Sequence, residues 1–260
     1  MRRHAWTSGI DAAVLAALLA AAPIMAADDV RPGLTEQPCA ADQRPPTPAE
    51  WPDWFRRSIA EDFGHLCRYA AANTQVARPV RVVFIGDSIT EGWPGYSPRL
   101  FSNGIIGRGI GGQTSPQMLV RFRQDVIDLQ PAAVHIMVGT NDIAGNTGPQ
   151  KMEWVEGHIH SMADLARAHG IRVIIGSVPP ALVFPWRPGL KPAPQIVELN
   201  RRLKAWADRE GYMFVDYHSA LVGPDGGMKP GLATDGVHPS EAGYRVMEAT
   251  VRAALARALP

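Results

Sequence analysis

Four short polar stretches interrupt apolar runs along the chain and carry the residue types that ester hydrolysis needs. They are GDSIT at 86–90, GRGIGGQTS at 107–115, VGTND at 138–142 and DGVHPS at 235–240. A serine hydroxyl is a weak nucleophile until a neutral imidazole accepts its proton, and a carboxylate fixes the tautomer of that imidazole. The stretches supply all three groups, as Ser88, His238 and Asp235, and the last two are close enough in one turn for Asp235 to bind Nδ1 while Nε2 faces Ser88.

The same stretches contain groups that could stabilise a developing oxyanion. The Gly111-Gly112 pair can expose backbone N–H groups, and Asn141 can add its side-chain amide. Taken alone, Gly86-Asp87-Ser88 is also typical of an ordinary strand-to-helix turn, in which Asp or Ser caps the next helix. The nucleophile interpretation therefore depends on the three later stretches, and Asp87 is given no catalytic role.

The elements that would position these residues follow from the apolar pattern. Nearly continuous apolar runs predict strands at 80–85, 104–107, 132–138, 171–178 and 213–216, and helical spacing predicts helices at 115–129, 149–169, 194–210 and 239–259. Such alternation indicates an α/β fold, a three-layer sandwich with a parallel sheet of about five strands. Ligands bind such sheets beyond the carboxyl ends of the strands, which is where the first three polar stretches lie.

The order GDS, glycine block, GxND and DxxH resembles the SGNH hydrolases, also called GDSL-type esterases and lipases, from Val80 to about Leu259. The resemblance implies a flavodoxin-like sandwich, no metal and no organic cofactor. It also implies the site residues: Ser88 as nucleophile, His238 as base, Asp235 as the partner that orients it, and Ser88, Gly112 and Asn141 as oxyanion donors. The chain departs from the family at Gly107, where many members have Asn.

The substrate is expected to bind beside the loop at 179–194, which follows the fourth predicted strand. Trp186 offers a flat face for a sugar ring or acyl chain and Arg187 a fork for a carboxylate or hydroxyls, although Trp186 could equally pack the loop down. We expect an open groove at the sheet edge, because flavodoxin-like sheets lack a built-in lid. Resemblance to the secreted acetylesterase branch implies a short acyl ester, most simply acetyl, of a carbohydrate-like alcohol. The alternatives are a lysophospholipase or thioesterase for longer chains, and a non-catalytic carbohydrate-binding protein.

The N-terminal residues have the layout of a secretory signal peptide. Basic residues at 2–4 precede an apolar run at 12–22, which is too short to span a hydrocarbon core that needs about 20 residues. We expect a signal peptide at 1–26, an extension at 27–78 and the catalytic domain at 79–260. The protein would then be periplasmic or extracellular, with no stable membrane insertion.

If the protein is exported, its two cysteines are expected to form a disulfide. Cys39 and Cys67 both lie in the extension and would meet an oxidising compartment, so we expect a disulfide rather than two buried free thiols. Closing this loop would stabilise the fold by about 3 kcal/mol in the chain-entropy model. Prolines cluster at 44–52 and 179–194, and we expect loops or linkers at both places.

The net charge, the remaining histidines and one glycine motif limit the kinds of ligand that the chain is expected to bind. Twenty-six Lys and Arg against 25 Asp and Glu leave a net charge of +1, which favours a small-molecule or oligosaccharide ester over nucleic acid. His158 and His160 point in different directions on one helix, so we expect a solvated surface rather than a metal site, and His135 should be a core histidine. The GxGxxG at 107–112 follows the second strand and does not predict a dinucleotide site. No feature points to a particular oligomeric state.

Overall fold

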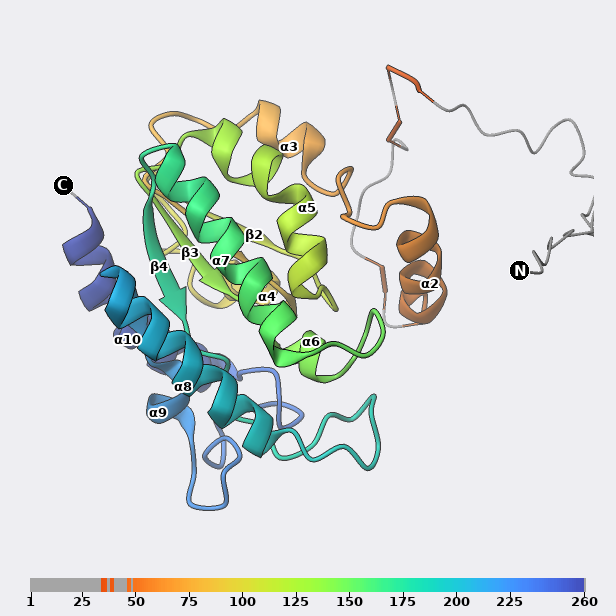
Figure 1. Cartoon of the computed structure of the whole chain (residues 1–260), viewed down its shortest axis with the longest axis vertical. Coiled ribbons are helices and arrows are strands. Elements are labelled where there is room, and N and C mark those ends of the chain that lie inside the picture. Colours follow the sequence, from red (N-terminus) through yellow and green to blue (C-terminus); the bar gives the residue numbers. More distant parts are fainter. Residues whose placement is uncertain (1–33, 37, 40–45, 48, 260) are drawn as a thin grey trace, which may run out of the picture. The chain divides into compact units, whose positions relative to one another are not determined.

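The computed structural model describes residues 34–36, 38–39, 46–47 and 49–259, and the expected signal peptide lies outside them (Figure 1). The chain divides into two compact units, residues 1–40 and residues 41–260. All of the helices and strands below belong to the second unit. Within the described ranges, no helix is long and apolar enough to cross a membrane.

Five parallel strands form one sheet in the order β2-β1-β3-β4-β5. They are β1 (Val82–Gly86), β2 (Ile105–Gly109), β3 (Ala133–Met137), β4 (Arg172–Gly176) and β5 (Met213–Val215). The chain runs outward from β1 to β2 and then crosses back to β3, so the strand order reverses between β1 and β3. Ligands bind flavodoxin-like sheets at this reversal. The predicted parallel sheet and its five strands are confirmed.

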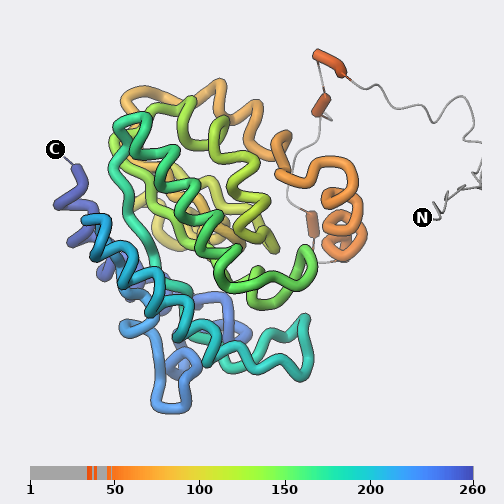
Figure 2. The backbone as a smooth tube through the Cα atoms, viewed as in Figure 1, coloured from red at the N-terminus to blue at the C-terminus, as the bar shows by residue number. Residues whose placement is uncertain are grey.

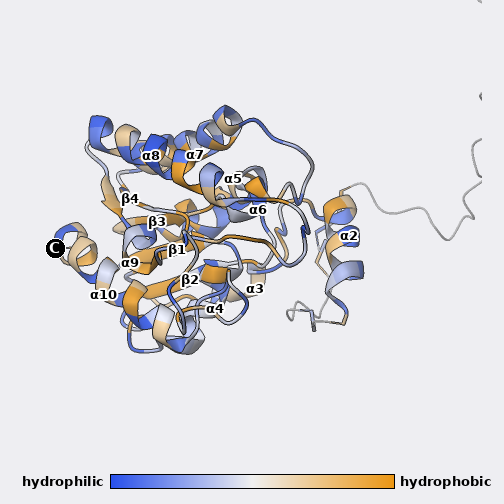
Figure 3. Ribbon diagram, turned by 90° about the horizontal axis from the view of Figure 1, so that it is seen from below, coloured by the Kyte–Doolittle hydropathy of each residue, from blue (hydrophilic) through white to orange (hydrophobic). Residues whose placement is uncertain are grey.

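Helices cover both faces of the sheet (Figure 3). One face carries α5 (Ser115–Asp125), α7 (Met152–Ala168) and α8 (Ala193–Glu210), and the other carries α4 (Ser88–Tyr96), α9 (Tyr217–Leu221) and α10 (Glu241–Ala258). The strands pack against two separate apolar clusters because alternate side chains point to opposite faces. The predicted three-layer sandwich is therefore confirmed. A short helix, α6 (Thr140–Ile143), follows β3 directly.

Two proline positions differ from the sequence prediction. The segment 44–52 was expected to be loop throughout, but Trp51 and Pro52 begin α2 (Trp51–Glu61). Proline is tolerated in a first helical turn because the N–H it lacks would have no intrahelical acceptor. The last helix begins at Glu241 rather than Pro239, since the Ser240 side chain caps it by accepting from the N–H of Gly243.

The extension contributes α2 and α3 (Ala70–Thr74), both orange in Figure 2. Three glutamine side chains on or before α5 donate to backbone carbonyls between these helices: Gln113 to Gly64, Gln117 to Phe63 and Gln124 to Leu66. Asp62 caps the same turn by accepting from the N–H groups of Leu66 and Cys67. Cys39 and Cys67 are both disulfide-bonded, as expected.

Three histidines outside the polar stretches, His135, His158 and His160, are packed against neighbouring side chains. His135 lies fully buried in β3 and its Nε2 is 2.8 Å from the Tyr217 hydroxyl, which confirms a core histidine. The expected solvated surface at the other two is wrong, because both are half-buried against neighbouring helices. His158 Nδ1 is 2.9 Å from the Ser115 hydroxyl of α5, and His160 stacks on Trp206 of α8 with ring centroids 4.1 Å apart.

Candidate active site

A continuous line of hydrogen bonds joins the predicted nucleophile, base and carboxylate. Ser88 Oγ lies 2.9 Å from His238 Nε2, and His238 Nδ1 lies 2.7 Å from Asp235 Oδ2. The other carboxylate oxygen, Oδ1, accepts from the backbone N–H groups of Val237 and His238. Partial burial raises the pKa of Asp235, but the His238 N–H, the imidazole and the Val237 N–H together hold that pKa below its usual value. The carboxylate is therefore ionised where it faces the imidazole.

Local structure brings the two ends of this line together. Ser88 is the first residue of α4, directly after β1, and Asp87 caps the helix by accepting from the Ile89 N–H at 3.0 Å. The 235–238 turn is closed by the Thr234 N–H, which donates to the His238 carbonyl at 2.9 Å. Both segments meet at the carboxyl edge of the sheet, although 150 residues separate the serine from the histidine.

The predicted oxyanion donors follow three adjacent strands. Gly86 of β1 is paired with Gly109 of β2 and with Met137 of β3, so the residues that come next share one edge. As first residue of α4, Ser88 has an N–H without an intrahelical acceptor. The N–H of Gly112 has no acceptor among the described residues, and its φ of +75° is a conformation that favours glycine.

Asn141 is buried and held on both sides of its amide. Its Nδ2 donates to the Gln113 carbonyl at 3.1 Å and, over a long 3.4 Å, to Asp87 Oδ2, while its Oδ1 accepts from Asn146 Nδ2 at 2.9 Å. Burial raises the pKa of Asp87 to about 6, against the opposing effect of the Ile89 N–H. Asp87 therefore has a structural place that the sequence left open: it caps α4 and touches the amide of Asn141.

The glycine block is held without the asparagine that many relatives have at its start. A Cβ on Gly107 would come 2.9 Å from the Pro94 ring in α4, so the chain packs too closely there for a side chain. The block is held instead by Tyr69, whose hydroxyl donates to the Gly109 carbonyl, and by Glu91, whose Oε2 accepts from the Gly111 N–H at 2.8 Å.

Arg108 and Gln113, to which the sequence assigned no role, both belong to the support of this block. Arg108 Nε donates to Asn73 of α3 at 2.8 Å. Gln113 Oε1 accepts at 2.6 Å from the fully buried Arg121, which also donates to the Gly86 carbonyl at 3.1 Å and pairs with Asp125 at 3.0 Å. A buried arginine thus ties the end of β1 to the block that follows β2.

Trp186 and Arg187 are adjacent in the sequence, but their side chains contact different parts of the protein. The Trp186 ring stacks on Phe184 and lies 6.2 Å from the His238 ring, and its Nε1 donates to Asn146 Oδ1. Arg187 Nη2 donates to the Gly145 carbonyl at 2.6 Å. Trp186 therefore flanks the histidine, and Arg187 braces the loop after α6.

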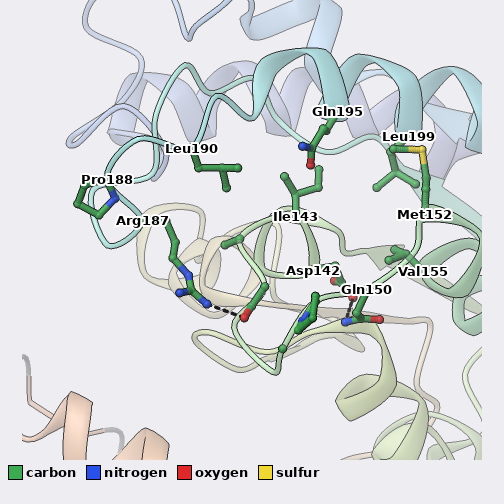
Figure 4. Close-up of a pocket in the computed structure, with 14 residues that line it drawn as sticks. Asp142, Ile143, Gln150, Met152, Val155, Arg187, Pro188, Leu190, Gln195 and Leu199 are labelled. Atoms are coloured by element: carbon green, nitrogen blue, oxygen red, sulfur yellow. Dashed lines mark hydrogen bonds between the residues drawn. The ribbon is translucent and has the colours of Figure 1, made fainter.

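Arg187 also lines a cavity of about 480 Å³ between that loop and α8, shown in Figure 4. The triad residues do not line this cavity. Asp142 is its buried carboxylate and accepts from the Ser115 N–H, the Ser115 hydroxyl and Gln150. Burial raises the pKa of Asp142 to about 6 despite these hydrogen bonds.

Sequence reasoning missed three residues near the site. Asn146 donates to both the Gly112 carbonyl and Asn141 Oδ1, and Glu91 orients Gly111. Trp51 of α2 packs against Gly112, because a Cβ there would come 2.7 Å from the indole. The helical period predicts that Glu91, three residues after Ser88, shares its face of α4, but neither Asn146 nor Trp51 belongs to a recognisable motif.

A family model and solved structures of known proteins both point to one family for this chain. Residues 84–246 match the model of the GDSL-like Lipase/Acylhydrolase family. A putative acylhydrolase from Bacteroides fragilis is 50% identical and covers 76% of this chain and 99% of its own, with a TM-score of 0.74. A GDSL-like lipase from Bacteroides thetaiotaomicron is 49% identical, covering 76% and 100%, with a TM-score of 0.73.

More distant matches include two curated proteins. Esterase TesA of Pseudomonas aeruginosa is 28% identical over 183 residues, which are 64% of this chain and 83% of that protein. The uncharacterized lipoprotein YqeF of Bacillus subtilis is 37% identical over 75 residues, 27% of this chain, so the chain spans under a third (30%) of that relative's length.

Proposed function

This chain belongs to the GDSL-like lipase/acylhydrolase family and is a carboxylic ester hydrolase, and we propose both a catalytic mechanism and a substrate class for it. Ser88, His238 and Asp235 hydrolyse short acyl esters, most simply acetyl, of carbohydrate-like alcohols. The observation that carries the proposal is the unbroken line from Ser88 Oγ through the imidazole to Asp235, at 2.9 and 2.7 Å.

In the first half of the reaction His238 Nε2 takes the Ser88 proton while Oγ attacks the ester carbonyl. The carbonyl oxygen becomes an oxyanion that accepts from the N–H groups of Ser88 and Gly112 and from Asn141 Nδ2, where it replaces the long 3.4 Å contact with Asp87. Each preorganised donor of this kind is worth about 100- to 1000-fold in rate. His238 then gives its proton to the departing alcohol, and the acyl group remains on Ser88.

In the second half water attacks the acyl-enzyme. His238 accepts a proton from the water, the tetrahedral intermediate forms again, and the carboxylic acid leaves as the proton returns to Ser88. Asp235 keeps the proton of the neutral imidazole on Nδ1, so Nε2 is the nitrogen that accepts in both halves. The proposed steps use these side chains, the backbone N–H groups of Ser88 and Gly112, and water.

The carbohydrate-like alcohol is supported by the surroundings of His238. The leaving oxygen must lie next to the imidazole that protonates it, and Trp186 lies 6.2 Å from that ring with 36% of its surface exposed. A flat apolar ring with a polar edge suits a sugar face. Arg187, occupied by the Gly145 carbonyl, is the second candidate contact for substrate hydroxyls.

We also place the protein outside the cytoplasm. Disulfides persist in oxidising compartments and are rare where thiols are kept reduced, and both cysteines of this chain are disulfide-bonded. Polymeric or oligomeric acetylated glycans would be accessible there.

The test is hydrolysis of nitrophenyl esters from two to twelve carbons, followed by acetate release from acetylated oligosaccharides. We expect the highest kcat/KM at two to four carbons and acetate release from the oligosaccharide. A maximum at eight carbons or more would favour a lysophospholipase or thioesterase and overturn the short-acyl proposal. Unchanged hydrolysis by Ser88→Ala would overturn the catalytic assignment, and absence of any hydrolysis by the intact chain would favour a binding protein.

A further inference from the structure

Trp51 of the extension lies against the same residues that the proposed chemistry uses. A Cβ built on Gly111 would have Ser88 Cβ and Trp51 Nε1 each 3.8 Å away. The serine and the indole thus border one methyl-sized space, together with Glu91 Oε2 at 3.1 Å from the same point. On Gly112, whose N–H is a proposed oxyanion donor, a Cβ would come 2.7 Å from Trp51 Cζ2 and 3.1 Å from Phe55 Cε2.

The indole is fixed in this position by its neighbours. Trp51 stacks face to face on the buried Phe55, with centroids 4.8 Å apart and planes 10° from parallel. Farther along, Trp54 meets the buried His65 edge-on at 4.7 Å. The glutamine side chains of the α5 region then hold the carbonyls of residues 63, 64 and 66. Helix α2 is therefore docked by stacking and by hydrogen bonds rather than by the sheet ladder.

The geometry of the tetrahedral intermediate determines which side of the site each substrate group faces. Its four substituents are Ser88 Oγ, the oxyanion that faces the Gly112 N–H, the leaving oxygen that faces His238, and the acyl group in the remaining direction. Trp186 flanks His238 and so belongs to the alcohol side. Trp51 packs against Gly111 and Gly112, whereas the aromatic ring beside His238 is that of Trp186. The acyl group is therefore the substituent that Trp51 can border.

We propose that Trp51 is a specificity-determining residue that closes the acyl side of the site and restricts the acyl group to a short chain. The inference rests on the proposed esterase function and deepens it, because it names the residue that sets the acyl length. An indole packed over the glycine block leaves little space for further methylene groups. A site that rejects or accepts one methylene discriminates by about 10- to 200-fold in rate.

The experiment compares kcat/KM on two-, four- and eight-carbon nitrophenyl esters for the full chain, Trp51→Ala and Trp51→Phe. Removing the indole opens space beside Ser88, so Trp51→Ala is expected to raise the ratio of eight-carbon to two-carbon activity at least about tenfold. Trp51→Phe keeps a ring on Phe55 and is expected to stay near the parent ratio. Trp154→Ala, on the exposed face of α7, is the matched control with an unchanged ratio.

The outcomes separate this inference from the proposed function. An unchanged ratio in Trp51→Ala, with a parent that prefers short esters, overturns the role of Trp51 and leaves the proposed function standing. A parent that already prefers eight carbons overturns the short-acyl proposal whatever the variant does. A raised ratio together with an unchanged melting temperature supports the inference. A raised ratio that the disulfide-reduced parent also shows, with Trp51 intact, assigns the effect to loss of the extension and overturns the specific role of the indole.

Discussion

The residues around Ser88 come from two regions that are held in different ways. The catalytic edge comprises the polar stretches that follow β1, β2 and β3 together with the 235–238 turn, and its strands are fixed by a paired backbone ladder. The docked extension comprises α2, α3 and the turn between them, and it is fixed by side chains that donate to backbone carbonyls or stack on rings. In our proposal the first region carries the chemistry and the second the acyl selectivity, so the two properties should respond separately to mutation.

The largest expected effect breaks the catalytic edge. His238→Ala removes the proton acceptor of Ser88, so kcat/KM on an acetyl ester should fall by about 10⁴-fold or more. The melting temperature should stay close to that of the parent, because the ring is partly exposed. A fall of less than about tenfold would mean that a group outside the catalytic edge acts as base, and the division between the two regions would fail.

Asp235→Asn should give a smaller loss at the same edge. The amide can present the wrong group to Nδ1 and cannot stabilise the imidazolium, which lowers kcat by up to about 10⁴-fold in buried triads. Asp235 has a side-chain exposure of 39%, so solvent screens its charge and we expect about 10²- to 10³-fold. Asp208→Asn, an exposed carboxylate on α8, is the control with unchanged kinetics.

The docked extension should respond to pH through His65. Burial is the main cause that lowers the pKa of His65 to about 4, opposed by Asp62. In the unfolded chain His65 becomes protonated near pH 6.5, but in the folded chain it stays neutral until about pH 4. The folded state therefore loses stability relative to the unfolded state as pH falls from about 6.5 to about 4. The loss attributable to this residue is up to about 3 kcal/mol.

The variant His65→Asn tests the contribution of His65 to this pH dependence, because asparagine tolerates the left-handed φ of 53° and does not titrate. Urea unfolding at pH 7 and pH 4.5 should show a smaller loss of unfolding free energy in the variant than in the parent. Equal losses would show that docking of the extension does not depend on a neutral His65. The buried His135 is present in both chains, so its own contribution cancels.

The smallest expected effect lies where the two regions touch. Tyr69→Phe removes the hydroxyl that donates to the Gly109 carbonyl and should lower the unfolding free energy by about 1 kcal/mol, with a loss of kcat of about threefold. Tyr96→Phe, at an exposed ring of α4, is the matched control. A loss of kcat above about 100-fold would make the extension part of the catalytic support rather than of selectivity alone.

The catalytic edge was predictable from sequence because its signals are local. Continuous apolar runs of the right length mark buried parallel strands, and the polar residues that break them, such as Ser88 and Asn141, lie at strand ends where the fold places its ligands. The pairing of Asp235 with His238 was also local, since three residues in a turn suffice. Ser88 and His238, 150 residues apart, are brought together by the packing of α10 against α4, where the Tyr244 hydroxyl donates to the Ile89 carbonyl at 2.8 Å.

The docked extension was not predictable in the same way. Trp51 reaches Gly112 only through contacts such as Gln113 to Gly64, which lie 49 residues apart and leave no periodic pattern. Proline at 52 suggested a loop although it lies in the first turn of a helix. His158 and His160 were expected at a solvated surface because helical spacing gives their directions but not the neighbouring helices that cover them.

The most direct test of the account is covalent labelling with diethyl nitrophenyl phosphate. An activated serine attacks the phosphorus and releases nitrophenol, so we predict one diethylphosphoryl group per chain, found by peptide mapping on Ser88, with activity lost in proportion to labelling. His238→Ala should label far more slowly. A label on any other residue, or full labelling of Ser88 with hydrolysis retained, would contradict the assignment of Ser88 as the nucleophile.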